Sequence, residues 1–184
     1  MKANSFLAVD LTDEDRHALS AALMEANPGR PLPGRRPKPA TWHMTLRFLG
    51  DIDETTTDRV KVEVEQTLSA ERGRVLCRGL GAFPRPTRAG VIFAAIDDPD
   101  GLVTELASQC DWAAQDAGLD PEERAFVPHI TLSRLRPQQD VRRVLAAFGD
   151  FRVTIKVDII SLMRTEVVRG ELRYETIEEF PLGG

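Results

Sequence analysis

Short runs of alternating apolar and polar residues separate segments with helical spacing along this chain. The run "SFLAVDL" predicts a first strand that ends at Asp10, and Thr12 is placed to cap the polar helix that follows. Asn27, with a proline and a glycine after it, ends this helix. Residues 29–41 are rich in proline, glycine and arginine, which predicts an exposed, mobile loop.

The rest of the chain continues this succession of strands and helices. Strands are predicted for "HMTLRFLG", "RVLCRGLGAF", "AGVIFAAI" and "PHITLSRLR", and helices for "DETTTDRVKVEVEQTLSA", "PDGLVTELASQCDWAAQDAG" and residues 140–148. The tail predicts two or three further strands, with a hairpin turn at Arg169-Gly170. Helices that separate runs of hairpin-forming strands favour an α+β fold over a doubly wound parallel sheet.

Two of the predicted strands contain the same phrase, "HMTL" and "HITL", in a chain with only three histidines. Side chains alternate along a strand, so each phrase presents a polar pair on one face and an apolar pair on the other. The polar pairs are His43 with Thr45 and His129 with Thr131. If the two strands are neighbours, two imidazoles and two hydroxyls converge. His17 lies in a polar helix and is expected at the surface.

Two imidazoles suit a reaction that removes a proton at one place and delivers one at another. Their reference pKa of about 6.5 makes both protonation states accessible near neutral pH. Threonine hydroxyls can donate to phosphoryl oxygens, and a nearby arginine can neutralise the charge that develops there. The combination therefore favours metal-free phosphoryl transfer by in-line displacement.

Other interpretations of the histidines fit the sequence less well. A zinc site would need a ligand from elsewhere, because neither phrase contains a carboxylate and no HExxH occurs. A Ser-His-Asp hydrolase lacks the G-x-S-x-G signature. One His-x-Thr phrase alone would be read as structural, but its recurrence with two of the three histidines favours a functional site.

Charge distribution points to a local anion site within an acidic protein. The net charge is −5, yet residues 26–50, 72–96 and 124–139 contain arginines and no Asp or Glu. Both histidine phrases lie in these acid-free stretches, which suits a bound anion.

The 184 residues suffice for one domain, or two small lobes that fold as a unit. Cys77 and Cys110 make a disulfide framework improbable, and without a membrane span or secretion signal we expect a cytoplasmic protein.

The paired phrases resemble the two signature motifs of the 2H phosphoesterase superfamily. More closely, "HMTLRFLGDID", "GLGAFPRPTRAGVIFAAI", "PHITLSRLR" and "RYETIEEFPL" are similar, in this order, to segments of the RNA 2′,3′-cyclic phosphodiesterases, once named 2′-5′ RNA ligases. The resemblance covers essentially the whole chain. It implies one domain over residues 1–184, made of two pseudo-symmetric lobes whose antiparallel sheets face a central cleft, with helices outside.

The resemblance also implies an activity and residues for it. The activity is hydrolysis of terminal 2′,3′-cyclic phosphates of RNA or nucleotides to 2′-phosphates, by a monomer that needs no metal or other cofactor and no membrane. His43 and His129 become the acid-base pair, and Thr45, Thr131 and Arg134 hold the phosphate. In the family's usual direction the first histidine protonates the leaving 3′ oxygen and the second activates water. A regular strand points Arg134 away from His129, so a bulge or strand end is required.

Several points stay open at this stage. The family has other residues at Trp42, Met44 and Phe93, and we expect none of these differences to touch the chemistry. Trp42 or Phe48 could stack on a base, although Phe48 shares the core-facing parity of Leu46 and is expected to be buried. The alternatives are a nucleotide- or RNA-binding module without catalysis, 2′-5′ ligation of RNA at the same site, and a structural protein whose repeated phrases are core strands.

Overall fold

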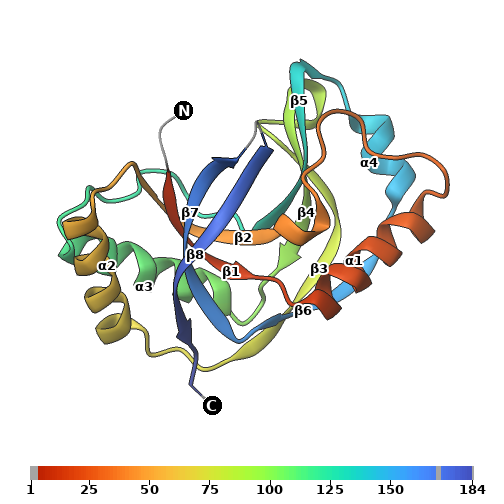
Figure 1. The fold of residues 1–184 in the computed structure, drawn as a ribbon. Coiled ribbons are helices and arrows are strands. Elements are labelled where there is room, and N and C mark those ends of the chain that lie inside the picture. Colours follow the sequence, from red (N-terminus) through yellow and green to blue (C-terminus); the bar gives the residue numbers. More distant parts are fainter. Residues whose placement is uncertain (1–3, 169–170, 184) are drawn as a thin grey trace.

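Two four-stranded antiparallel sheets form the centre of the protein, which is represented by a computed structural model that describes residues 4–168 and 171–183 (Figure 1). Sheet A has the order β2 (His43–Gly50), β1 (Ser5–Asp10), β7 (Ile159–Val168) and β8 (Glu171–Pro181). Sheet B has the order β5 (His129–Gln139), β4 (Ala89–Asp97), β3 (Gly73–Phe83) and β6 (Arg152–Val157). Each histidine phrase therefore begins an edge strand, one in each sheet.

Four α-helices and two short 3-10 helices complete the described part of the chain. The α-helices are α1 (Asp13–Ala26), α2 (Glu54–Thr67), α3 (Leu102–Asp116) and α4 (Arg142–Phe148), and the 3-10 helices are η1 (Pro39–Thr41) and η2 (Pro86–Arg88). Thr12 caps α1 as predicted, since its hydroxyl accepts from the Asp15 amide at 3.1 Å. None of the helices in the described ranges combines the length and the apolar character needed to cross a bilayer.

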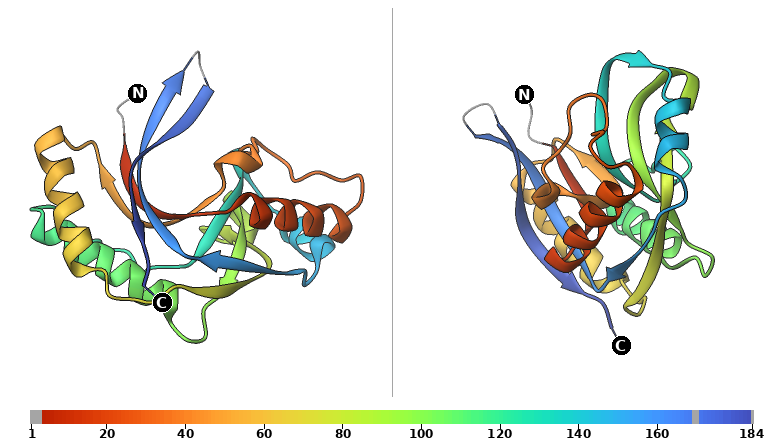
Figure 2. Two further views of the ribbon diagram at one scale, coloured as in Figure 1. Left: turned by 60° about the horizontal axis from the view of Figure 1, so that its bottom comes forward. Right: turned by 90° about the vertical axis from the view of Figure 1, so that its right-hand side faces the viewer.

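Helices α1 and α3 each pack on the sheet opposite to the one whose strand precedes them in the chain. Helix α1 follows a strand of sheet A but packs against β6 of sheet B, close to α4, which contacts β3. Helix α3 follows a strand of sheet B but packs with α2 against sheet A, where it contacts β2. The two views of Figure 2 show these pairs, α1 with α4 and α2 with α3, on the outer sides of the two sheets.

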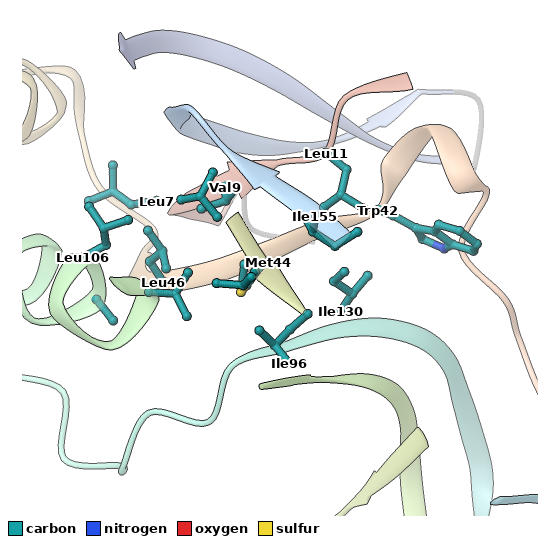
Figure 3. Close-up of a cluster of buried hydrophobic side chains, with 14 of the residues drawn as sticks. Leu7, Val9, Leu11, Trp42, Met44, Leu46, Ile96, Leu106, Ile130 and Ile155 are labelled. Carbon is teal, nitrogen blue, oxygen red and sulfur yellow. The ribbon is translucent and has the colours of Figure 1, made fainter. Parts of the chain in front are cut away.

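The apolar sides of the two histidine strands meet in one hydrophobic core. Met44 of β2 and Ile130 of β5 are both fully buried in the same cluster, together with Leu7 of β1 and Ile155 of β6 (Figure 3). Full burial of one side chain of this size stabilises the fold by roughly 1.5–3 kcal/mol. Residues of both histidine strands therefore contribute to the same core.

The observed elements confirm most of the predicted ones, including the α+β class. The tail contains three strands, and the turn predicted at Arg169-Gly170 lies outside the described residues. Most of residues 29–41 are exposed as expected, but Leu32 is buried, and Arg35 pairs with Arg134 on the free edge of β5. His17 is exposed as expected, and Cys77 and Cys110 are buried free thiols.

Candidate functional site

Each catalytic candidate histidine is oriented by the backbone two residues before it. His43 Nδ1 lies 2.9 Å from the Thr41 carbonyl oxygen, and His129 Nδ1 lies 2.7 Å from that of Val127. A carbonyl oxygen only accepts hydrogen bonds, so Nδ1 carries the proton in both rings. The Nε2 atom of each ring is thus the nitrogen that accepts when the imidazole is neutral and donates when it is charged.

Aromatic rings enclose both imidazoles. Phe6 stacks on His43 with ring centroids 4.9 Å apart, and Tyr174 meets the same ring edge-on, also at 4.9 Å. His129 has an equivalent pair, Phe83 and Phe93, at 5.0 and 5.2 Å. The sequence analysis did not identify Phe6, Tyr174 and Phe83 as neighbours of the histidines, because they lie on other strands.

Burial makes both histidines weak bases in the free protein. It lowers the pKa of His43 to about 4, and the Thr41 carbonyl opposes this shift while the charges of Arg134 and His129 add to it. Burial also lowers the pKa of His129, again opposed by its carbonyl partner and reinforced by Arg134. Arg134 thus acts on the pKa of both rings, and His129 acts on that of His43.

A β-bulge brings Arg134 onto the same side of β5 as His129. The register of β5 against β4 shifts between two pairs, Phe93 with Thr131 and Ile92 with Ser133, so one β5 residue is extra. Beyond it the alternation is inverted, so that Ser133 is buried and Arg134 is exposed. The bulge required by the sequence argument is therefore present.

The same bulge occurs in β2 and overturns one expectation. Ala8 pairs with Thr45 and the preceding Leu7 with Arg47, so β2 also has an extra residue after its Thr. As a result Phe48 is not buried but 52% exposed, with its ring 6.1 Å from that of Phe6. Phe48 occupies the place in β2 that Arg134 occupies in β5.

Two further residues lie elsewhere than the sequence suggested. Trp42 is buried in the core at 7% exposure and is not available to stack on a base. Phe93 was expected to stand apart from the chemistry, but it contacts the His129 ring and also stacks on Phe83 at 4.3 Å. Gly81 accommodates this ring, because a Cβ there would lie 2.4 Å from Phe93.

The polar groups beside the histidines are unengaged. Thr45 and Thr131 are half-buried, and within residues 4–168 and 171–183 their hydroxyls have no hydrogen-bond partner. The guanidinium of Arg134 likewise has no carboxylate partner there. Across the described residues no three His, Cys, Asp or Glu side chains gather as metal ligands. The site therefore offers two imidazoles, two hydroxyls and one guanidinium to an oxyanion.

The bulge of each histidine strand anchors the loop that leads to the other histidine. In β5, Ser133 Oγ donates to the Pro33 carbonyl, and Arg134 exchanges two backbone hydrogen bonds of 2.9 Å with Arg35, upstream of His43.

In β2, the buried Arg47 is in reach of the segment that leads to His129. Its Nε lies 2.6 Å from an Asp111 oxygen, in an ion pair that is not aligned as a hydrogen bond. Arg47 Nη2 donates to the Asp120 carbonyl, and Nη1 lies 3.7 Å from a Glu122 oxygen. The loop before His43 is thus held by β5 of sheet B, and the segment before His129 by β2 of sheet A.

Comparison with known proteins identifies the group to which this arrangement belongs. A family model described as the 2′-5′ RNA ligase superfamily matches residues 19–169, a span that includes both histidine phrases. The chain belongs to the 2′-5′ RNA ligase superfamily. An RNA 2′,3′-cyclic phosphodiesterase of Aeropyrum pernix in the curated set is 31% identical over 75% of this chain and 80% of its own length. Another RNA 2′,3′-cyclic phosphodiesterase, from Methanothermobacter thermautotrophicus, is 28% identical over 99% of this chain and 100% of its own length.

Solved structures of similar proteins share the fold. Escherichia coli LigT in complex with 3′-AMP superposes with a TM-score of 0.80 at 21% identity, covering 99% of each chain. The protein TT0787 of Thermus thermophilus superposes with a TM-score of 0.76 at 25% identity, covering 98% of each chain. The two-sheet architecture of this member of the superfamily is therefore that of LigT.

Proposed function

We propose that the protein hydrolyses terminal 2′,3′-cyclic phosphates of RNA or nucleotides to 2′-phosphates, with His43 and His129 as acid-base pair. The observation that carries the proposal is the matched geometry of the two rings, each with Nδ1 held by a carbonyl and Nε2 left for the substrate. The curated relatives named RNA 2′,3′-cyclic phosphodiesterases support the substrate class. LigT has been crystallised with 3′-AMP, which supports a nucleotide ligand.

The proposed reaction exchanges one P–O bond for another. One neutral imidazole removes a proton from water as the water oxygen bonds to phosphorus. The bond from phosphorus to the 3′ oxygen breaks in line, and the second, protonated imidazole delivers its proton to that oxygen. The protonation states of the two rings are then reversed, and exchange with solvent restores them. No redox or metal-bound intermediate enters this sequence.

The remaining polar groups stabilise the charge on the phosphoryl oxygens. The Thr45 and Thr131 hydroxyls donate to these oxygens, and Arg134 contributes its positive charge. Because Arg134 also lowers the pKa of both histidines in the free protein, a bound anion that neutralises Arg134 raises both values. Substrate binding therefore supplies the conditions under which one ring becomes protonated.

The exposed Phe48 ring supports recognition of a nucleotide. It lies beyond Thr45 on the side of β2 that carries His43, and aromatic rings in such positions stack on nucleobases. The site needs no second chain, because one copy supplies both histidines, and we propose that the protein acts as a monomer. Light scattering at the mass of one chain, 20.5 kDa, tests this.

The test is turnover of an RNA that ends in a 2′,3′-cyclic phosphate, in the presence of EDTA. His43→Ala and His129→Ala are each expected to lower kcat at least about 100-fold, the range of general acid-base catalysis. His17→Ala, which removes the exposed third histidine, is the matched control and is expected to retain full activity. The product is identified as a 2′- or 3′-phosphate by its mobility against synthetic standards.

Full activity in either site variant, or a requirement for an added metal ion, would contradict the mechanism. Tight binding of a 2′-phosphorylated nucleotide without turnover of any cyclic phosphate would instead identify a binding module. Circular dichroism of each variant separates these outcomes from loss of folding.

A further inference from the structure

Strand β5, the β3–β4 turn and the loop that pairs with β5 carry a group of arginines without carboxylate partners. Their side chains are exposed and, within the described ranges, have no ion pair or hydrogen bond; they are Arg35, Arg36, Arg85, Arg88, Arg134 and Arg136. This is not the rule for the chain, since Arg78 pairs with Asp150 at 2.6 Å and Arg142 with Asp140 at 2.6 Å. The unpaired charges gather where the sequence is free of acids.

A hollow of about 530 Å³ lies between the β3–β4 turn and the end of β5. It is lined by Pro84, Arg85, Arg88 and Gln138. The turn and the segment after β5 are joined by a hydrogen bond of 2.8 Å from the Val141 amide to the Pro86 carbonyl. Figure 2 shows this turn and the end of β5 side by side at one end of the molecule.

The hollow adjoins the histidine site along two strands. On β3, Phe83 contacts the His129 ring, and the next residue, Pro84, already lines the hollow. On β5, the chain runs from Arg134 to Gln138, which also lines it. Two short segments of chain, one through Phe83 and one from Arg134 to Gln138, therefore connect the surroundings of His129 to the hollow.

The surface near the histidines also carries positive charge, from Arg35 and Arg134 at the edge of β5. Arg35 is held next to Arg134 by the backbone bridge on the edge of β5. Burial raises the pKa of Tyr174, whose ring meets that of His43 edge-on, and the charges of Arg134 and Arg35 both oppose that shift. Sheet A contrasts with this surface, because its strand β8 exposes Glu175, Glu178 and Glu179.

We propose that Arg35, Arg134, Arg136, Arg88 and Arg85 form an arginine track that binds the backbone phosphates of an RNA strand whose cyclic end lies at the histidines. The proposal rests on the function proposed above and names its preferred substrate, an oligonucleotide and not a mononucleotide. A 2′,3′-cyclic phosphate terminates the 3′ end, so all other phosphates of the strand leave the site on one side. Unpaired guanidinium groups arranged on that side bind phosphates through charge-assisted hydrogen bonds.

The test compares two substrates in one protein and its variants. The value of kcat/KM is measured for an RNA of about ten nucleotides with a 2′,3′-cyclic end, and for cytidine 2′,3′-cyclic phosphate, at about 0.05 to 0.2 M salt. The double variant Arg85→Gln/Arg88→Gln is expected to lose about tenfold with the RNA and nothing with the mononucleotide. For the RNA, the slope of log(kcat/KM) against log(salt concentration) is expected to be shallower in this variant by about 1.4, or about 0.7 for each lost phosphate contact.

The matched control removes two positive charges from the outside of the molecule, on α2. Arg59→Gln/Lys61→Gln makes the same change in net charge and is expected to leave both substrates and the salt slope unchanged. An equal loss for RNA and mononucleotide would overturn the track, because the turn would then belong to the catalytic site. Unchanged RNA kinetics in the Arg85/Arg88 variant would overturn it as well.

A binding measurement keeps this proposal separate from the proposed function. Fluorescence anisotropy gives the Kd of a labelled RNA with a 2′-phosphate end, which needs no turnover. Weaker binding by the Arg85/Arg88 variant supports the track even if no cyclic phosphate is hydrolysed. Equal binding by this variant and the α2 control rejects it even if hydrolysis is observed.

Discussion

The two histidines owe their chemistry to what surrounds each ring. His43 lies between Phe6 and Tyr174, and the resulting burial lowers its pKa to about 4. At neutral pH such a ring is uncharged, with its proton fixed on Nδ1 by a carbonyl. It accepts a proton at Nε2 only when a negative charge, such as a bound phosphate, stabilises the charged form.

Removal of the Tyr174 ring tests directly whether burial by this ring lowers the pKa of His43. Tyr174→Ala admits water to His43, which is expected to raise its pKa from about 4 toward the ordinary value of 6.5. The measurement is the pH titration of the His43 ring proton by NMR. Tyr174→Phe keeps the ring and serves as control. A His43 pKa that is the same in the Ala variant and the wild type would show that burial by Tyr174 is not its cause.

Single residues also show where sequence reasoning stops. His43, Thr45 and Met44 were placed on the correct faces, because strict alternation holds up to Leu46. It failed for Phe48, because the bulge depends on the partner strand β1 and leaves no signal in β2 itself. The aromatic neighbours of the histidines come from other strands and are set by sheet order, which alternation within one strand does not report.

At the scale of elements, each sheet depends on segments of the other. Helices α1 and α3 pack on the sheet opposite to the one from which they emerge. Arg47 of β2 reaches Asp111 on α3 and the Asp120 carbonyl, in the segment before β5. We propose that the two lobes therefore fold as a single domain over residues 1–184.

Urea unfolding tests this proposal and the part that Arg47 plays in it. The wild type is expected to show one transition, coincident by fluorescence and circular dichroism. Arg47→Met leaves Asp111 without its positively charged partner and is expected to lower the free energy of unfolding by about 3 kcal/mol, still in one transition. Arg124→Met is the control, because its pair with Glu122 is exposed and is worth less than about 1 kcal/mol.

Two separated transitions, in the wild type or in either variant, would contradict a single domain. An Arg47→Met protein as stable as the wild type would show instead that the buried ion pair is dispensable.

The sequence predicted the number and order of the elements well, because turns and periodicity are local. It did not predict the exchange of helices between sheets, which depends on contacts between residues far apart in the chain.

At the scale of the whole molecule, the two sheets share one core, and each sheet carries one of the two candidate catalytic histidines. Strands β2 and β5 are in contact, and Met44 and Ile130 on their apolar sides belong to the same core. The proposed function requires both sheets, because neither sheet carries both of the histidines that we propose as acid and base. The central claim is therefore that one phosphate engages both imidazoles at once.

Nitrogen-15 NMR of the imidazoles, with and without a saturating nucleoside 2′-phosphate, tests this claim most directly. The account predicts that the Nε2 signals of His43 and His129 shift together, with one binding curve, and that the pKa of both rings rises in the complex, while His17 is unaffected. A shift confined to one of the two site histidines, or two different binding curves, would contradict it.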